Sequence, residues 1–317
     1  MVVGLVVAAA NPATQLPPPG ARSPGQAAID RVLADAIGRH DVPGVVAIAT
    51  DRRGVIYEGA VGMADATATR PMTLDAIFRI ASLTKPITSV AAMQLVEQGR
   101  VNLDDPAAKH LPSLGGLSVF ESFDSRTGAY RVRPAVKTLT VRHLLTHTSG
   151  LGYNFTSPVV RDFKPRDGEQ YGAGPLLFEP GEQWLYGTST DWVGRLVESI
   201  SGKTLDAYFR ERILDPLAMA DTSYNVPEAK RPRLVAVHRR QPDGSVTAGP
   251  SRPPAPVARV GGGGGLSSVR RQRGARRARQ LRTGRVSGRA RFQGMTPRIP
   301  EWARRARGKG EAGSESW

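Results

Sequence analysis

The chain has no cysteine among its 317 residues. This absence excludes disulfide bonds, thiolate metal sites and thiol catalysis, and it leaves the redox compartment undetermined. Long hydrophobic runs are also missing, since no apolar stretch approaches the roughly 20 residues that a membrane-spanning helix needs. Apolar residues still make up 40% of the sequence, enough for a core in one large domain or two small ones.

Acidic residues are scarce in the last part of the chain while arginine is abundant, and this segment carries most of the net charge. Residues 267–317 contain fourteen Arg and one Lys against three Glu, a net +12 of the chain's +16, so the other 266 residues carry only +4. The same segment has almost no aliphatic periodicity, and we expect a disordered tail. Its cations could bind polyanions without sequence preference, but only Phe292, Trp302 and Trp317 are available for base stacking, so no specific nucleic-acid partner is expected.

The N-terminus has no basic residue ahead of its apolar stretch. Residues 1–10 (MVVGLVVAAA) resemble the apolar part of a secretory signal, and without a basic start they leave an exported and a cytoplasmic location equally open. Residues 11–24 are rich in Pro, Ala and Gly, which indicates a linker. We therefore place a folded domain at residues 25–266, between the N-terminal segment 1–24 and the tail 267–317.

Hydrophobic spacing and capping residues predict several helices and one hairpin within this domain. Helices are expected at 26–39, 82–98, 140–145, 191–200 and 204–213, and the hairpin at 45–59. Residues 112–137 and 152–180 lack clear periodicity, and we expect irregular surface segments there.

The tetrad Ser82-Leu83-Thr84-Lys85 stands at the predicted start of an apolar helix. Residues i and i+3 share a helix face, so the Ser82 hydroxyl and the Lys85 amine can meet within one turn. Pro86 supports this placement because a first helical turn tolerates proline. Ser82 would then be a nucleophile at the positive end of a helix, with Lys85 as its base if the lysine pKa is lowered enough to leave the amine neutral. The alternative is a helix N-terminus with a solvated lysine.

Two further patterns point to binding sites less clearly. His143 and His147 are four residues apart, but no glutamate lies between them and no third ligand is apparent, so we expect structural roles and neither metal nor other cofactor. The five glycines at 261–265 lack the lysine and hydroxyl residue of a phosphate-binding loop. A loop near the site is therefore favoured over an anion cradle.

More motifs follow the tetrad in order: Leu103-Asp104-Asp105-Pro106, His143-Leu144-Leu145-Thr146-His147-Thr148-Ser149-Gly150-Leu151, Glu179-Pro180-Gly181 and Asp215-Pro216-Leu217-Ala218-Met219. Together with the tetrad they resemble the serine hydrolases of the penicillin-binding, class C β-lactamase-like family, which includes β-lactamases, D-alanyl-peptide hydrolases and esterases. The likeness covers roughly residues 25–266. It implies an α/β (α+β) fold, with an antiparallel sheet flanked by helices and a mostly helical subdomain, and acyl transfer from a small ester or amide substrate to Ser82.

The family's second catalytic element is a Tyr-x-Asn triplet, and Tyr186-Gly187-Thr188 stands in its place. The resemblance implies that Tyr186 shares proton transfer with Lys85, although a packed aromatic beside Trp184 is the alternative. Thr188 replaces the asparagine and could hold its substrate-binding position. Because esterase-like members often lack this asparagine, and because the segment from His147 to Tyr153 is also esterase-like, carboxylic esters are favoured over β-lactams and D-alanyl peptides.

The family's third element, a Lys-Thr-Gly or His-x-Gly triplet on a late strand, is not found, and we expect the C-terminal strands to be missing with it. Arg282-Thr283-Gly284 lies too early and outside a strand-like run. In the family the glycine run leads into a Ser-Thr-Ala-Asp-Asp-like helix start, whereas here Val269-Arg270-Arg271-Gln272 follows Ser268. The codons allowed for these four residues, read one base later, can spell Ser-Ala-Asp-Asn. We hypothesise that the tail is translated out of frame, which sequencing of the coding DNA would test.

The sequence therefore predicts a serine hydrolase that forms an acyl-enzyme at Ser82 and acts on small carboxylic esters. The late strand normally supplies the oxyanion hole with its second donor, beside the Ser82 amide. The alternative is thus an inactive, truncated or frameshifted family member whose basic tail binds polyanions. The sequence does not indicate an oligomeric state.

Overall fold

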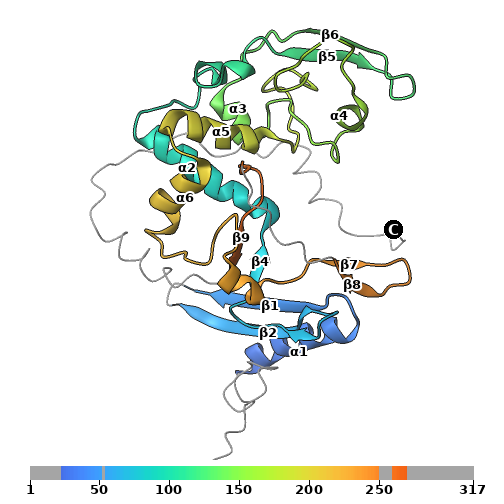
Figure 1. Cartoon of the computed structure of the whole chain (residues 1–317), viewed down its shortest axis with the longest axis vertical. Coiled ribbons are helices and arrows are strands. Elements are labelled where there is room, and N and C mark those ends of the chain that lie inside the picture. Colours follow the sequence, from blue (N-terminus) through green and yellow to red (C-terminus); the bar gives the residue numbers. More distant parts are fainter. Residues whose placement is uncertain (1–22, 52–53, 250–258, 270–317) are drawn as a thin grey trace, which may run out of the picture. The chain divides into compact units, whose positions relative to one another are not determined.

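A computed structural model describes residues 23–51, 54–249 and 259–269 (Figure 1). Residues 270–317 of the tail, which include Arg282-Thr283-Gly284, lie outside these residues, and so does the N-terminal signal-like segment. Of the four residues on which the reading-frame hypothesis rests, only Val269 is described. Among the described helices, none is long and apolar enough to cross a membrane.

The N-terminal part of the described chain is a helix followed by an antiparallel sheet. Helix α1 (Pro24–Gly38) begins at a capping box in which the Ser23 side chain accepts a hydrogen bond from the Gln26 amide. The sheet has the order β1 (Gly44–Thr50), β2 (Val55–Asp65), β3 (Arg70–Pro71). The predicted helix and hairpin are both confirmed. Of the described strands, only β2 pairs with β1.

A second group of elements is mostly helical and contains the larger core (Figure 1). Its helices are α2 (Thr84–Glu97), α3 (Val141–Leu145), α4 (Pro158–Asp162), α5 (Ser189–Ser201) and α6 (Leu205–Phe209), which continues as a π-helical segment (Arg210–Leu214). Helices α2 and α5 pack against each other, and fully buried side chains fill the space around them: Ala91, Leu95, Leu144, Val193, Leu196 and Phe209. This apolar core fixes the N-terminal ends of α2 and α5, where the predicted site residues lie.

Capping residues set the helix boundaries in this group. The Thr140 side chain accepts a hydrogen bond from the His143 amide at the start of α3, and Thr204 caps α6 through the Ala207 amide. Helix α5 ends at Gly202, whose φ of 74° belongs to the left-handed region that glycine enters without strain. Shorter 3₁₀ turns occur at Ala81–Leu83, Ala107–Lys109, Pro112–Leu114 and Glu228–Arg233.

The expectation of irregular structure over residues 112–137 is wrong. This segment forms the hairpin β5 (Ser118–Phe123) and β6 (Tyr130–Pro134), paired in antiparallel register. Phe120 of β5 packs edge-to-face on Phe163, with 5.1 Å between the ring centroids. The hairpin is therefore stabilised by an aromatic residue from the later segment 152–180, which local periodicity does not reveal.

A strand from the end of the described chain reaches the start of the site. Strand β9 (Ser267–Val269) pairs antiparallel with β4 (Ile77–Arg79), and Ser267 and Ser268 are buried. Packed backbone thus continues past residue 266, where the sequence analysis ended the domain. The remaining hairpin joins β7 (His238–Arg240) to β8 (Val246–Ala248).

Candidate active site

Ser82 lies in the 3₁₀ turn that joins β4 to α2, at the N-terminal end of the helix. Its neighbour Ala81 has a φ of +43°, a left-handed conformation that is strained for a residue with a Cβ. The turn is held because the Thr84 hydroxyl donates to the Ala81 carbonyl at 2.7 Å and accepts from the Leu266 amide at 3.2 Å. The Ser82 side chain is exposed, and its amide donates no hydrogen bond within the described part of the chain. An exposed hydroxyl and an available amide donor are thus presented together, as the predicted roles of nucleophile and oxyanion donor require.

Lys85 lies one helical turn beyond Ser82, as its spacing predicts. Its Nζ donates to Ser82 Oγ at 3.2 Å and to the carbonyl of Gly263 at 2.7 Å. The second bond crosses 178 residues and brings the glycine run to the site. Lys85 is therefore held against Ser82 from both sides and is not a freely solvated lysine.

Tyr186 completes this group from the segment before α5. Lys85 Nζ lies 4.6 Å from the centroid of the Tyr186 ring. Burial raises the pKa of the Tyr186 hydroxyl, but hydrogen bonds with Lys85 and Ser82 and the positive charge of Lys85 outweigh it, so that the net shift is downward. Tyr186 is thus a packed aromatic whose hydroxyl also interacts with Ser82 and Lys85, and its role in proton transfer stays a prediction.

His147 packs against Tyr186, whereas His143 lies in α3 and binds its N-cap residue. The His147 ring lies 5.1 Å from the Tyr186 ring, and its Nδ1 accepts from the Gly187 amide at 3.4 Å. Burial and the nearby charge of Lys85 lower the pKa of His147, while Asp191 opposes this shift. His143 instead caps α3, where its Nδ1 accepts from the Thr140 amide at 3.3 Å.

Groups of three or more His, Asp or Glu side chains that could bind a metal ion do not occur among the described residues.

Thr188 is the N-cap residue of α5, two positions after Tyr186. Its carbonyl accepts hydrogen bonds from the Asp191 and Trp192 amides, and its side chain makes no capping hydrogen bond. The substrate-binding role that the resemblance implies for Thr188 stays a prediction.

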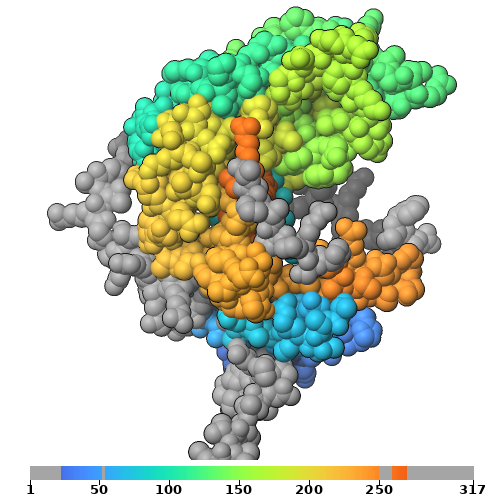
Figure 2. Space-filling model, viewed as in Figure 1, coloured from blue at the N-terminus to red at the C-terminus, as the bar shows by residue number. Residues whose placement is uncertain are grey.

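The glycine run 261–265 forms a loop beside Lys85, as the sequence analysis favoured. Thr88 of α2 donates to the Gly262 carbonyl at 2.7 Å, and Tyr224 donates to the Gly261 carbonyl at 2.8 Å. A Cβ on Gly262 would lie 2.3 Å from the Thr190 carbonyl oxygen, so only glycine allows the loop to approach α5 this closely. In Figure 2 the orange surface of residues 259–269 meets the yellow surface of α5.

Sequence reasoning missed Asp191, which binds this loop, and Tyr153, which binds Asp191. Asp191 Oδ1 accepts from the Gly263 amide at 2.9 Å, and Asp191 Oδ2 accepts from the Tyr153 hydroxyl at 3.2 Å. Tyr153 belongs to the esterase-like segment, and Asp191 opens a predicted helix. The available signal was the glycine run itself, because consecutive glycines indicate a close approach of backbone to another element.

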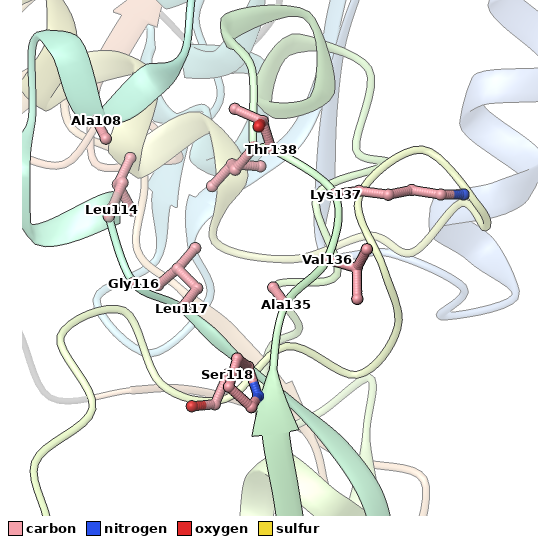
Figure 3. Close-up of a pocket in the computed structure, with 12 residues that line it drawn as sticks. Ala108, Leu114, Gly116, Leu117, Ser118, Ala135, Val136, Lys137 and Thr138 are labelled. Carbon is pink, nitrogen blue, oxygen red and sulfur yellow. The ribbon is translucent and has the colours of Figure 1, made fainter.

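A hollow of about 430 Å³ lies away from these residues, between the 3₁₀ turns after α2 and the irregular segment 135–139 that follows β6 (Figure 3). Leu114, Leu117, Ala135 and Lys137 are among the residues that line it. It contains none of Ser82, Lys85 or Tyr186, so the candidate active site and this hollow are separate features.

The comparison with known families identifies the class of protein. The sequence profile of the Beta-lactamase family matches residues 29–312, so the chain belongs to this family. The predicted resemblance is confirmed, and so is the β-lactamase/transpeptidase-like α/β fold class. The match includes most of the Arg-rich tail.

Individual relatives include acyltransferases and esterases. Acyltransferase mokF of Monascus pilosus is 34% identical over 236 residues, which are 68% of this chain and 56% of that protein. Lovastatin esterase of Penicillium rubens is 34% identical over 257 residues, 76% of this chain and 61% of that protein. The solved structure of simvastatin synthase (LovD) from Aspergillus terreus has a TM-score of 0.68 at 30% identity, covering 78% of this chain and 65% of that one. The chain thus spans less than two thirds of the length of each of these relatives.

Proposed function

We propose that this chain is a serine hydrolase that forms an acyl-enzyme at Ser82 and hydrolyses small carboxylic esters. The observation that carries the proposal is the position of Lys85 Nζ, 3.2 Å from Ser82 Oγ and 4.6 Å from the Tyr186 ring centroid. A serine hydroxyl is a weak nucleophile until a base takes its proton, and the adjacent Lys85 and Tyr186 side chains supply that base. A relative named as an esterase, lovastatin esterase, supports ester substrates.

The lowered pKa of Tyr186 favours its phenolate as the proton acceptor, with the Lys85 ammonium stabilising the negative charge. Ser82 Oγ bonds to the ester carbonyl carbon as its proton passes to Tyr186, and the Ser82 amide hydrogen-bonds the developing oxyanion. The bond to the alcohol oxygen then breaks, and the alcohol leaves with the proton from Tyr186. Water attacks the acyl carbon next, gives its proton to the same base, and releases a carboxylic acid as Ser82 regains a proton.

Exposed apolar side chains around this group support substrates with apolar acyl or alcohol portions. Leu83 follows Ser82 directly and is 68% exposed. Phe155 is 73% exposed and stacks on Tyr153, and Trp184 is 67% exposed and contacts His147 by its ring edge. When a ligand covers apolar side chains this exposed, the burial of their surface stabilises the complex.

The test is the mass of the intact protein after reaction with a fluorophosphonate and, separately, with a penicillin, together with turnover of p-nitrophenyl butyrate. We expect one fluorophosphonate adduct and ester turnover in the natural chain, and neither in Ser82→Ala. Ser89→Ala, a change of the same kind further along α2, should react like the natural chain. A folded protein that forms no adduct would contradict the proposal and favour the inactive alternative, and a penicillin adduct alone would move the substrate class to β-lactams.

A further inference from the structure

Asp191 is a half-buried carboxylate with two hydrogen bonds and no part in the reaction proposed above. It lies in the first turn of α5, five residues after Tyr186. Its Oδ1 accepts from the Gly263 amide at 2.9 Å, and its Oδ2 accepts from the Tyr153 hydroxyl at 3.2 Å. The two oxygens therefore bind two segments that are far apart in the sequence.

Both partners of Asp191 contact Lys85. The Gly263 carbonyl accepts from Lys85 Nζ at 2.7 Å, and the Tyr153 ring centroid lies 5.5 Å from the same nitrogen. Gly263 and Tyr153 therefore each link Asp191 to Lys85. Any displacement of the Gly263 loop or of the Tyr153 ring would move the groups that hold the ammonium in place.

The glycine run is fitted to this carboxylate. A Cβ on Gly263 would lie 2.4 Å from Asp191 Oδ2, and a Cβ on Gly261 would lie 2.8 Å from Asp191 Oδ1. Two of the five glycines therefore leave room for Asp191 itself, which indicates that the loop and the carboxylate act as one unit.

We propose that Asp191 is a positioning residue that fixes the Gly263 carbonyl and the Tyr153 ring, and through them holds the Lys85 ammonium against Ser82 and Tyr186. This inference rests on the proposed function for its catalytic consequence. Its structural content, the anchoring of the glycine loop, can be measured without any substrate.

The charge of Asp191 also acts on the surrounding ionisable groups, which come from every element packed around it. These groups are His147 after α3, Tyr153, Tyr186 and Tyr224, and the nearby cation is Lys85 of α2. The carboxylate raises the pKa of Tyr186, against the larger lowering from its contacts with Lys85 and Ser82. Removing only the charge should therefore lower the Tyr186 pKa further and make its phenolate available at lower pH.

Two substitutions separate the hydrogen bonds from the charge. Asp191→Asn keeps an oxygen for the Gly263 amide and a polar group for Tyr153, but it is neutral. Asp191→Ala removes both the acceptors and the charge, and leaves a partly buried amide without its partner. Asp162→Asn is the matched control, because Asp162 pairs with the neighbouring Arg161 on the surface of α4 and, among the described residues, has no hydrogen bond to the glycine loop.

The experiment measures the fluorophosphonate labelling rate across pH and, on the same proteins, hydrogen exchange of the glycine-run amides. We expect Asp191→Ala to exchange at Gly263 faster by about tenfold to a hundredfold and to label more slowly by a similar factor. Asp191→Asn should exchange like the natural chain, and its labelling profile should shift to lower pH. Asp162→Asn should change neither.

The outcomes distinguish this inference from the proposed function. If the natural chain forms no Ser82 adduct, the proposed function fails, and the exchange rate at Gly263 still tests whether Asp191 anchors the loop. Unchanged exchange in folded Asp191→Ala overturns the anchoring. Faster exchange with an unchanged labelling rate overturns the positioning of Lys85, and a variant Asp191→Asn without a pH shift overturns the electrostatic part.

Discussion

Glu179 gives a quantitative test of how the segment before Tyr186 is held. Its carboxylate is buried, with the residue only 5% exposed, and accepts from the Val136 and Lys137 amides at 3.1 and 2.9 Å and from the Arg133 guanidinium. Glu179 is the first residue of the Glu179-Pro180-Gly181 turn, in which the Gly181 amide donates to the Thr148 carbonyl at 2.8 Å. This motif thus connects the chain around β6 to the segment that carries Tyr186.

The magnitude follows from the pKa of Glu179. Burial alone raises this pKa, but the hydrogen bonds from the Lys137 amide, Arg133 and the Val136 amide lower it more, from 4.5 to about 2. One pKa unit corresponds to about 1.4 kcal/mol, so the ionised carboxylate stabilises the fold by roughly 3 kcal/mol, less the screening by water around the half-exposed Arg133. Because the folded pKa is the lower one, this stabilisation is complete above the unfolded value of 4.5 and is lost as the pH falls towards 2.

The perturbation is Glu179→Gln, measured by urea denaturation at pH 7 and near pH 2.5. We expect a loss of roughly 2–3 kcal/mol at pH 7, because the amide keeps one acceptor but turns a donor towards the remaining amides, and a much smaller loss at the acidic pH. Glu182→Gln is the control, since its pair with Lys137 is solvent-exposed at both ends and such pairs contribute about 0–1 kcal/mol. An equal loss at both pH values would refute the assignment of the stabilisation to the ionised carboxylate.

Three further outcomes follow from contacts around the site and the core. Gly262→Ala should destabilise the fold by about 2 kcal/mol or more, because the new Cβ would clash with backbone atoms. Gly264→Ala should be nearly neutral, because the nearest atom to its Cβ would lie 3.7 Å away. Urea denaturation of the two variants checks this, and equal stability would contradict it. Lys85→Met should raise the Tyr186 pKa, since Lys85 lowers it, and ultraviolet titration should show ionisation at higher pH; an unchanged titration would mean that the two groups do not interact. Leu144→Ala should cost about 2–5 kcal/mol because the side chain is fully buried, and a loss below about 1 kcal/mol would show that the core closes over the cavity.

Local patterns predicted the features that depend on neighbours in the sequence. The spacing of Ser82 and Lys85 needs only one helical turn, and Thr140 and Thr204 cap helices whose amides lie three residues away. The hairpin at residues 45–59 has apolar strands flanking a short polar turn. Each of these signals lies within a few residues, so periodicity and turn chemistry could identify it.

Features that depend on distant contacts were not predicted. The β5–β6 hairpin carries an aromatic cluster completed by Phe163, which follows it by some thirty residues and has no periodic pattern of its own. Asp191 resembles any acidic residue in a first helical turn until the glycine run docks on it. The π-helical segment after α6 is likewise set by packing, because its sequence continues an ordinary helical pattern.

The bond between Lys85 and the Gly263 carbonyl also has a consequence for folding. The turn at Ser82 and helix α2 can form from local contacts, but the backbone that binds Thr84, Lys85 and Thr88 comes from 174 to 182 residues later. Contacts of such high sequence separation require a large loop to close and form late. During synthesis, a nascent chain would display Ser82 long before the glycine run leaves the ribosome. Reactivity of Ser82 would therefore report that the glycine run has docked on α2. The rate at which a covalent probe labels this serine during refolding would then measure the rate of that docking.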